Sequence, residues 1–299
     1  MWIAGVLSLM TVMGGTINLG FDLFPQEMEL VGRWDVSSSM ELDGFRKAFQ
    51  SEQTDGDLAF LTEAGLDPFA DVEDIYFGFM DMGENEDSSF VAAIRFNKKL
   101  DLKNIVEAFA ERKQESLQTE TYRGVTLFHP DDPENDIYVT DQIEGEWALA
   151  GDLNLVKKGV DRFFGEGTPI TEKQKLREST HNWTLPHLFW LSGNVTMPGQ
   201  AGLSKDVLLT VDYFNGIQLG GKIPYADEEE KLQINQLINM GSGLLMMMSQ
   251  GQMNPSDLRV EEKEGFIEFH VTIPEDMLAA LRQQAASMQK GSDDSESGQ

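Results

Sequence analysis

Four carboxylates lie close together in one predicted loop between two strands. They belong to Asp131, Asp132, Glu134 and Asp136. Carboxylate oxygens are the ligands that Ca²⁺ prefers, at about 2.3–2.6 Å. The spacing is not that of an EF-hand loop, because the glycine at the sixth position and the glutamate at the twelfth are missing. The cluster suggests a calcium site, and the alternative explanation is chance, since the chain has 51 acidic residues.

A second group of chemical interest is the methionine run Met246, Met247 and Met248. Thioether sulfurs bind Cu(I), and flexible methionines also line adaptable apolar grooves. Met248 continues the apolar stripe of a predicted helix, which favours packing in a core over ligand binding. Core packing is therefore the favoured interpretation of the three methionines, and an apolar or lipid-like ligand site is the alternative.

The sequence contains no motif typical of catalysis or of a cofactor site. None of the histidines (His129, His181, His187 and His270) pairs with another at helical metal-ligand spacing. A Gly-x-Ser-x-Gly elbow and a phosphate-binding loop are also absent. We expect no catalytic residues, no cofactor and no enzymatic activity. A hydrolase that uses unrecognised carboxylates stays open, because folding can bring any two acids together.

The composition limits the partners and the compartment. With 51 acidic and 23 basic residues the formal net charge is -28, which argues against nucleic acid and anionic membranes as partners. The chain has no cysteine, which excludes disulfides, thiolate catalysis and thiolate metal sites. Its 299 residues, 40% of them hydrophobic, are enough for a substantial core.

The two ends of the sequence differ from the rest. Residues 2–21 carry no charged side chain, which favours an export leader or an apolar membrane anchor over residues 1–21. Because no basic residue precedes this segment, an apolar first strand is the alternative. Residues 291–299 are polar and acidic, and we expect them to be disordered.

Local patterns predict an α+β fold. Alternating runs predict strands at residues 74–80, 90–96, 121–128, 136–141, 146–150, 207–214, 217–219, 258–262 and 266–273. Asn215-Gly216 is typical of a two-residue hairpin turn. Helices are predicted after the cap Asp101, at residues 153–164, from residue 227 and from Pro274. The apolar side of the helix from residue 227 is predicted to bury Ile234, Leu237, Ile238, Gly241, Leu244, Leu245 and Met248.

These elements predict antiparallel β-sheets with packed helices, arranged in two similar-looking halves. The polar segment Gly165 to Thr180 contains Gly167 and Pro169, and it is the predicted seam. The halves are then residues 22–165 and 166–290.

Three segments resemble a loose family of exported or envelope-associated bacterial proteins of unknown function. They are residues 64–78 (a helix end, an aspartate-rich turn and a strand), residues 148–161 (a strand, the turn Gly151-Asp152 and a helix) and residues 258–278 (a strand pair and a helix). The resemblance spans about residues 22–288 and its motifs are structural. It implies an extracytoplasmic location, and it transfers no catalytic residue.

Together these features predict a non-enzymatic extracytoplasmic protein, periplasmic or envelope-associated, that binds an unknown partner. One alternative is a binder of an apolar or lipid-like ligand at the methionine-rich helix, and the other is the hydrolase. The partner is a protein or an apolar ligand and not nucleic acid, an N-terminal membrane association is compatible with the leader, and the oligomeric state stays open.

Overall fold

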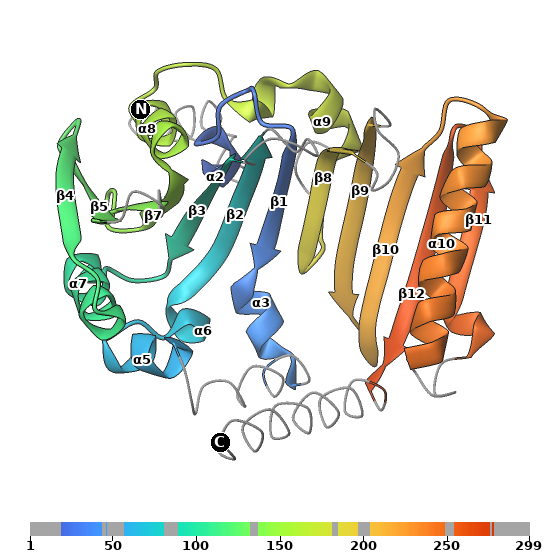
Figure 1. Cartoon of the computed structure of the whole chain (residues 1–299), viewed down its shortest axis with the longest axis horizontal. Coiled ribbons are helices and arrows are strands. Elements are labelled where there is room, and N and C mark those ends of the chain that lie inside the picture. The colour runs from blue at the N-terminus through green and yellow to red at the C-terminus, as the bar shows by residue number, and fades with distance from the viewer. Residues whose placement is uncertain are drawn as a thin grey trace, which may run out of the picture. The chain divides into compact units, whose positions relative to one another are not determined.

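Figure 1 shows the helices and strands of the computed structural model. The chain divides into two compact units, Met1–Asp206 and Val207–Gln299. The residues that the structure describes are 19–43, 46, 57–80, 89–131, 137–180, 185–196, 204–248, 254–275 and 277. Both units combine helices with antiparallel strands, which confirms the predicted α+β class. All but the last three residues of the predicted leader, and the whole predicted tail, lie outside the described residues, so both stay predictions.

The first unit is built on an antiparallel sheet with strand order β8-β1-β2-β3-β7-β6-β5-β4. The strands are β1 (Leu30–Asp35), β2 (Val72–Met80), β3 (Ser89–Phe96), β4 (Leu117–Tyr122), β5 (Val125–Pro130), β6 (Ile137–Thr140), β7 (Trp147–Asp152) and β8 (Phe189–Thr196). Strand β1 pairs on both sides, with Arg33 opposite Tyr76 of β2 and Trp190 of β8. Strand β8 therefore belongs to the same sheet as the N-terminal strands.

Short helices connect these strands. They are α2 (Leu19–Asp22), α3 (Val36–Glu41), α5 (Asp57–Glu63), α6 (Pro68–Asp71), α7 (Leu102–Lys113), α8 (Leu153–Phe163) and α9 (Gln174–Ser179). The predicted cap of α7 is confirmed, because the Asp101 carboxylate accepts a hydrogen bond from the Asn104 N–H at 3.2 Å. The predicted helix at residues 153–164 is confirmed as α8. No helix within the described part of the chain combines the length and the apolar composition that crossing a bilayer requires.

Helices pack on both faces of this sheet. On one face, the Phe21 ring of α2 lies 4.8 Å from the Tyr76 ring and 5.1 Å from the Trp190 ring, measured between centroids. On the other face, α3, α7 and three strands share a core of Val36, Val72, Phe96, Leu102, Ile105 and Ala148. Neighbouring residues of one strand thus serve two cores, because successive side chains point to opposite faces.

Two predicted local structures are wrong. The run at residues 121–128 is a hairpin between β4 and β5, because Arg123 and Gly124 turn the chain with φ of 51° and 83°. Gly151-Asp152 is the end of β7 and not a turn, since Gly151 pairs with Val91 on one side and Tyr138 on the other. Gly151 has φ of 143°, a conformation that favours glycine.

The predicted seam at residues 165–180 is part of the first unit, and the observed division lies after Asp206. Ile170, in the 3₁₀ turn η2 (Ile170–Glu172), is fully buried and donates its N–H to the Phe24 carbonyl at 2.9 Å. Pro169 forms a β-bridge with Pro25. The segment is polar in sequence, yet these contacts fix it to the residues that precede β1.

The second unit has strand order β9-β10-β12-β11. Its elements are β9 (Ser204–Tyr213, which starts just before the division), β10 (Gly216–Pro224), α10 (Glu228–Met248), the 3₁₀ turn η3 (Pro255–Asp257), β11 (Leu258–Lys263) and β12 (Phe266–Pro274). Both predicted hairpins are confirmed, one around Asn215 with φ of 53° and one between β11 and β12. The predicted two-residue loop of the first is wrong, because Tyr213 pairs with Ile217 and three residues lie between them. In β12, Ile267 and Val271 are buried while the His270 side chain is 57% exposed, as the alternation predicts.

Helix α10 follows its prediction in its first half. Ile234 is buried and Leu237 and Ile238 are half-buried. Gly241, which was predicted to be buried, is exposed, because nothing lies within 4 Å of a Cβ built there. The side chains of Leu244, Leu245 and Met248 lie outside what the structure describes. Pro274 is the last residue of β12, where it pairs with Gly216, and Glu275 and Met277 beyond it are helical, so a helix begins there one residue later than predicted.

We predict that Gly151→Ala destabilises the first unit more than Gly124→Ala does. A Cβ at Gly151 would lie 2.2 Å from the Phe90 carbonyl oxygen, whereas a Cβ at Gly124 meets nothing within 4 Å. Backbone strain and overpacking together should lower the free energy of unfolding by about 3 kcal/mol or more. Gly124→Ala should cost about 1–2 kcal/mol from its positive φ alone. Guanidinium denaturation of both variants measures this, and equal losses would contradict the tight contact at Gly151.

Candidate functional site

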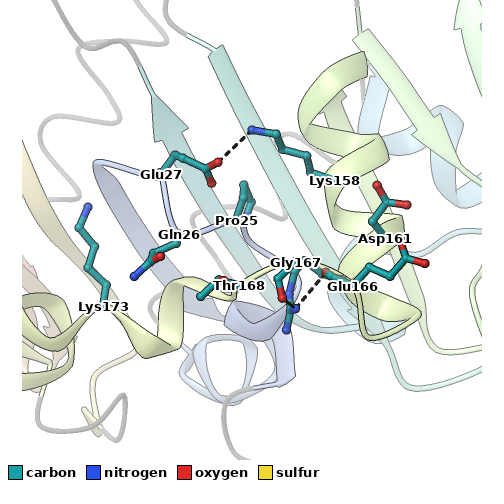
Figure 2. Close-up of a pocket in the computed structure, with 10 residues that line it drawn as sticks. Pro25, Gln26, Glu27, Lys158, Asp161, Glu166, Gly167, Thr168 and Lys173 are labelled. Atoms are coloured by element: carbon teal, nitrogen blue, oxygen red, sulfur yellow. Dashed lines mark hydrogen bonds and ion pairs between the residues drawn. The ribbon is translucent and has the colours of Figure 1, made fainter.

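The larger of two hollows described in the first unit has a volume of about 580 Å³, and we name it the α8 hollow. It is lined by Pro25, Gln26, Glu27, Lys158, Asp161, Arg162, Glu166, Gly167, Thr168 and Lys173. Figure 2 shows these residues on three segments: the loop before β1, helix α8, and the chain from the end of α8 to η2. The second hollow, of about 240 Å³, is lined by Gly124, Val125, Thr126, Asp141, Gln142, Ile143, Glu144, Phe163 and Phe164.

Local packing explains why α8 presents charges to this hollow. The helix buries Leu155, Val156, Gly159 and Val160 against the sheet. Gly159 permits that close approach, since a Cβ there would lie 2.7 Å from the Leu149 side chain. The hydrophilic side of the helix is left for Lys158, Asp161 and Arg162.

The opposite walls of the α8 hollow are tied together by the main chain. The Gln26 N–H donates to the Thr168 carbonyl at 3.1 Å, beside the Pro25–Pro169 bridge. The loop before β1 and the chain after α8 are therefore held as one surface, although their residues lie far apart in the sequence.

Arg162 and Lys173 also hold the walls in place. The Arg162 guanidinium donates to the carbonyls of Asp22 at 3.1 Å and Glu166 at 2.9 Å, and also to that of Gly167. The Lys173 ammonium donates to the Met28 carbonyl at 2.8 Å. Their positive charges thus lie on the walls of the hollow while their donors bind the backbone.

The two carboxylates on the α8 side of the hollow share one arginine as their ion-pair partner. Arg123, in the β4–β5 turn, lies 2.5 Å from an oxygen of Asp161 and 2.5 Å from an oxygen of Glu166. The Tyr122 hydroxyl donates to Asp161 at 2.9 Å. These contacts leave neither carboxylate without a donor.

The remaining charged pair in the hollow is looser. The Lys158 ammonium lies 3.4 Å from a Glu27 carboxylate oxygen, and the two side chains are 45% and 57% exposed. A hydrogen bond with its own backbone N–H lowers the pKa of Glu27, and Lys158 adds to this effect. Outside the lining, at the end of α2, burial raises the pKa of Asp22, against a 2.5 Å hydrogen bond from Thr171 and the charge of Arg162. The hollow therefore offers fixed charges of both signs, which suits a polar ligand.

The structure does not bring the predicted calcium ligands into a described site. Asp131 follows β5 and donates its N–H to the Ser116 carbonyl at 2.8 Å. Asp132, Glu134 and Asp136 lie outside the described residues. Among the residues that are described, no group of three or more histidine and carboxylate side chains is placed to hold a metal ion. The calcium hypothesis stays a prediction.

The methionine prediction is also untested. Met246 is half-buried in α10, while the side chains of Met247 and Met248 lie outside the described part. The two hollows described above are lined by the first unit and include no residue of α10. An apolar ligand at these methionines therefore stays a prediction.

One acid pair has part of the geometry that a hydrolase needs. Asp35 and Asp74 are opposite each other on β1 and β2, and burial raises the pKa of Asp74 against the charge of Arg33. Arg33 lies 2.6 Å from Asp74 and 3.3 Å from Asp35, and Asp35 also caps α3 by accepting from the Ser38 N–H. Because both acids are held by structural contacts and neither lines the two hollows, the pair supports the fold.

Sequence reasoning missed the α8 hollow. Glu27, Lys158 and Lys173 form no motif, and they come together only because two loops far apart in the sequence pair through their backbones. The available signal was weak: the net charge is -28, yet three basic residues occur on one helix of the predicted set, at positions 157, 158 and 162.

Comparisons with known proteins support the fold but not a family. No family model matches the chain, and no curated protein matches it. The fold resembles crystal form III of TP0453 with a TM-score of 0.51 at 10% identity, over 87% of this chain and 96% of that one. Crystal form I of TP0453 gives a TM-score of 0.48 at 9% identity, over 89% and 96% of the two chains. At such identity the likeness concerns the fold alone.

We predict an alkaline loss of stability that depends on Tyr76. Burial, and next the charge of Asp74, raise the pKa of Tyr76 from 10.0 to about 12. The neutral Tyr76 phenol makes its full contribution to the free energy of unfolding below pH 10, where it is neutral in both the folded and the unfolded chain. That contribution is lost as the pH rises to 12, because the phenol ionises in the unfolded chain first. The loss should reach about 3 kcal/mol or less.

Chemical denaturation between pH 9 and pH 12 tests this, with absorbance titration of the tyrosinate. The variant Tyr76→Phe should show a smaller alkaline loss than the wild type. Tyr225→Phe, in the second unit, retains Tyr76 and should keep the full loss. Identical pH profiles for Tyr76→Phe and the wild type would contradict the prediction.

Proposed function

We propose that this chain is a non-enzymatic extracytoplasmic binding protein that takes a small polar ligand into the α8 hollow. The observation that carries the proposal is the hollow itself, about 580 Å³ in volume and lined by charged side chains of both signs. Sites for small molecules usually measure roughly 300–1,000 Å³. Its walls are joined by backbone contacts, so the site is formed before any ligand arrives.

Binding without catalysis fits the residues of the hollow better than a reaction does. Its lining includes neither histidine nor serine, and Asp161 and Glu166 share Arg123. Both carboxylates are engaged by the Arg123 guanidinium, so using either one as a general acid or base would disrupt that pairing. Within the described part of the chain, the hydrolase alternative is supported by the Asp35–Asp74 pair, and Arg33 bridges that pair.

The extracytoplasmic location rests on the sequence. Residues 2–21 carry no charge, as expected of an export leader or anchor. The resemblance to exported bacterial proteins at residues 64–78, 148–161 and 258–278 agrees with this. An exported binding protein without an enzymatic role is the simplest function that accommodates both the leader and the hollow.

A panel of small polar compounds, measured by thermal shift, tests the proposed function. We predict that at least one compound stabilises the wild type and does not stabilise Gln26→Trp, whose indole would fill the α8 hollow from an exposed position. At a concentration near 100 times its Kd, a ligand contributes about 2.7 kcal/mol, or about 5–10 °C in Tm for a unit of this size.

The matched control is Gln118→Trp, an exposed position on β4 that does not line the hollow. It should respond to the compound as the wild type does. A compound that stabilises the wild type and Gln26→Trp equally would place its binding elsewhere, and a panel without any stabilising compound would argue against the proposal.

A further inference from the structure

The Glu27–Lys158 pair is the part of the α8 hollow best suited to exchange partners. Its 3.4 Å separation is longer than the roughly 2.7–2.9 Å of a strong charge-assisted hydrogen bond. An ammonium has three donors and a carboxylate about four acceptor positions, so each group can bind a ligand without releasing the other. Both side chains are about half exposed, so reorienting them costs little.

The other charges of the hollow are committed to its walls. Arg162 and Lys173 donate to backbone carbonyls, and Asp161 and Glu166 bind Arg123. A ligand that displaced these contacts would loosen the loops that form the site. In Figure 2, Lys158 extends from α8 toward Glu27 on the facing loop, with Gln26 and Pro25 beside them. The adjacent positive and negative groups at this point are therefore the ones that select the ligand.

Two adjacent opposite charges favour a ligand with the same arrangement. A purely anionic ligand would meet Glu27 and the field of a chain with net charge -28. A purely cationic one would meet Lys158, Arg162 and Lys173. A ligand whose ammonium and carboxylate are neighbours satisfies both groups at once, because its carboxylate approaches Lys158 while its ammonium approaches Glu27. The four charges then alternate in sign and sum to zero.

We infer that the α8 hollow binds a zwitterion of this kind, a free α-amino acid, with Lys158 holding the carboxylate and Glu27 the ammonium. The inference rests on the proposed function and names its ligand class. The volume of about 580 Å³ accommodates the backbone and any side chain of an α-amino acid. Specificity for one amino acid would come from the remaining lining residues.

Thermal shift with each of the twenty common α-amino acids, followed by isothermal titration calorimetry of those that bind, tests the inference. The N-acetyl derivative of a bound amino acid lacks the ammonium and its amide lacks the carboxylate. Each should bind about 10-fold more weakly or worse, the usual effect of losing one charge-assisted hydrogen bond. Glu27→Gln and Lys158→Met should each lose about 10-fold in affinity for the same reason.

The double variant E27K/K158E keeps adjacent opposite charges in reversed order, and it should recover most of the affinity lost in the single variants. The matched control is K103M/E107Q, which neutralises an exposed pair at 3.8 Å on α7 and should bind as the wild type does. Both substituted pairs are largely exposed, so melting curves without ligand should not differ from that of the wild type.

Failure of the inference and failure of the proposed function give different results. If no amino acid binds but another compound binds in a way that Gln26→Trp abolishes, the zwitterion inference is overturned and the proposed function stands. If the N-acetyl or amide derivatives bind as tightly as the parent amino acid, the pairing with Glu27 and Lys158 is also overturned. If nothing binds in the α8 hollow, both fall.

Discussion

The pairing of β1 with both β2 and β8 is the constraint on which the first unit depends. It joins residues near position 32 to residues near positions 77 and 191, so the sheet forms only when distant parts of the chain meet. The loop before β1 is then held beside the segment that leads from α8 toward β8, where Gln26 pairs with Thr168. The α8 hollow is a consequence of this strand pairing, because the two walls of the hollow belong to these two segments. Contacts of such long sequence separation cost loop-closure entropy, and burial at the centre of the sheet compensates for it.

Glycines and aromatic rings provide that central burial. A Cβ on Gly32 would lie 2.4 Å from the Phe77 ring, so the glycine lets this ring lie across β1. There the Phe77 ring stacks on the Phe189 ring of β8, with 5.5 Å between the two centroids. On the other face of the sheet, the Tyr76 ring packs directly on Gly20 of α2, where a Cβ would overlap the ring. A stacked pair of rings such as Phe77 and Phe189 contributes about 0.5–1.5 kcal/mol beyond the area that it buries.

Sequence patterns predicted what is decided locally. The Asp101 cap, the Asn215-Gly216 turn and the alternation of β12 depend on neighbouring residues, and the structure contains all three. The patterns failed where distant contacts decide. Gly151 looked like a turn because its sequence neighbours do not show that two strands flank it. The polar segment at 165–180 looked like a linker, although Ile170 anchors it in the core of the first unit. The α8 hollow could not be predicted for the same reason, since no local pattern relates residues 27 and 158.

The likeness to TP0453 bears on which features of this chain matter for binding. At 10% identity the likeness concerns the fold alone, and the fold says little about the side chains in a hollow. The charges that bear on a ligand are therefore those that the fold does not require. Arg162 and Lys173 bind backbone carbonyls and so contribute to the architecture. The charges of Glu27 and Lys158 meet at 3.4 Å on half-exposed side chains, and such a pair adds little to stability. Because the pair contributes little to the stability of the fold, binding of a ligand that uses both charges is the stronger physical reason for their adjacent arrangement.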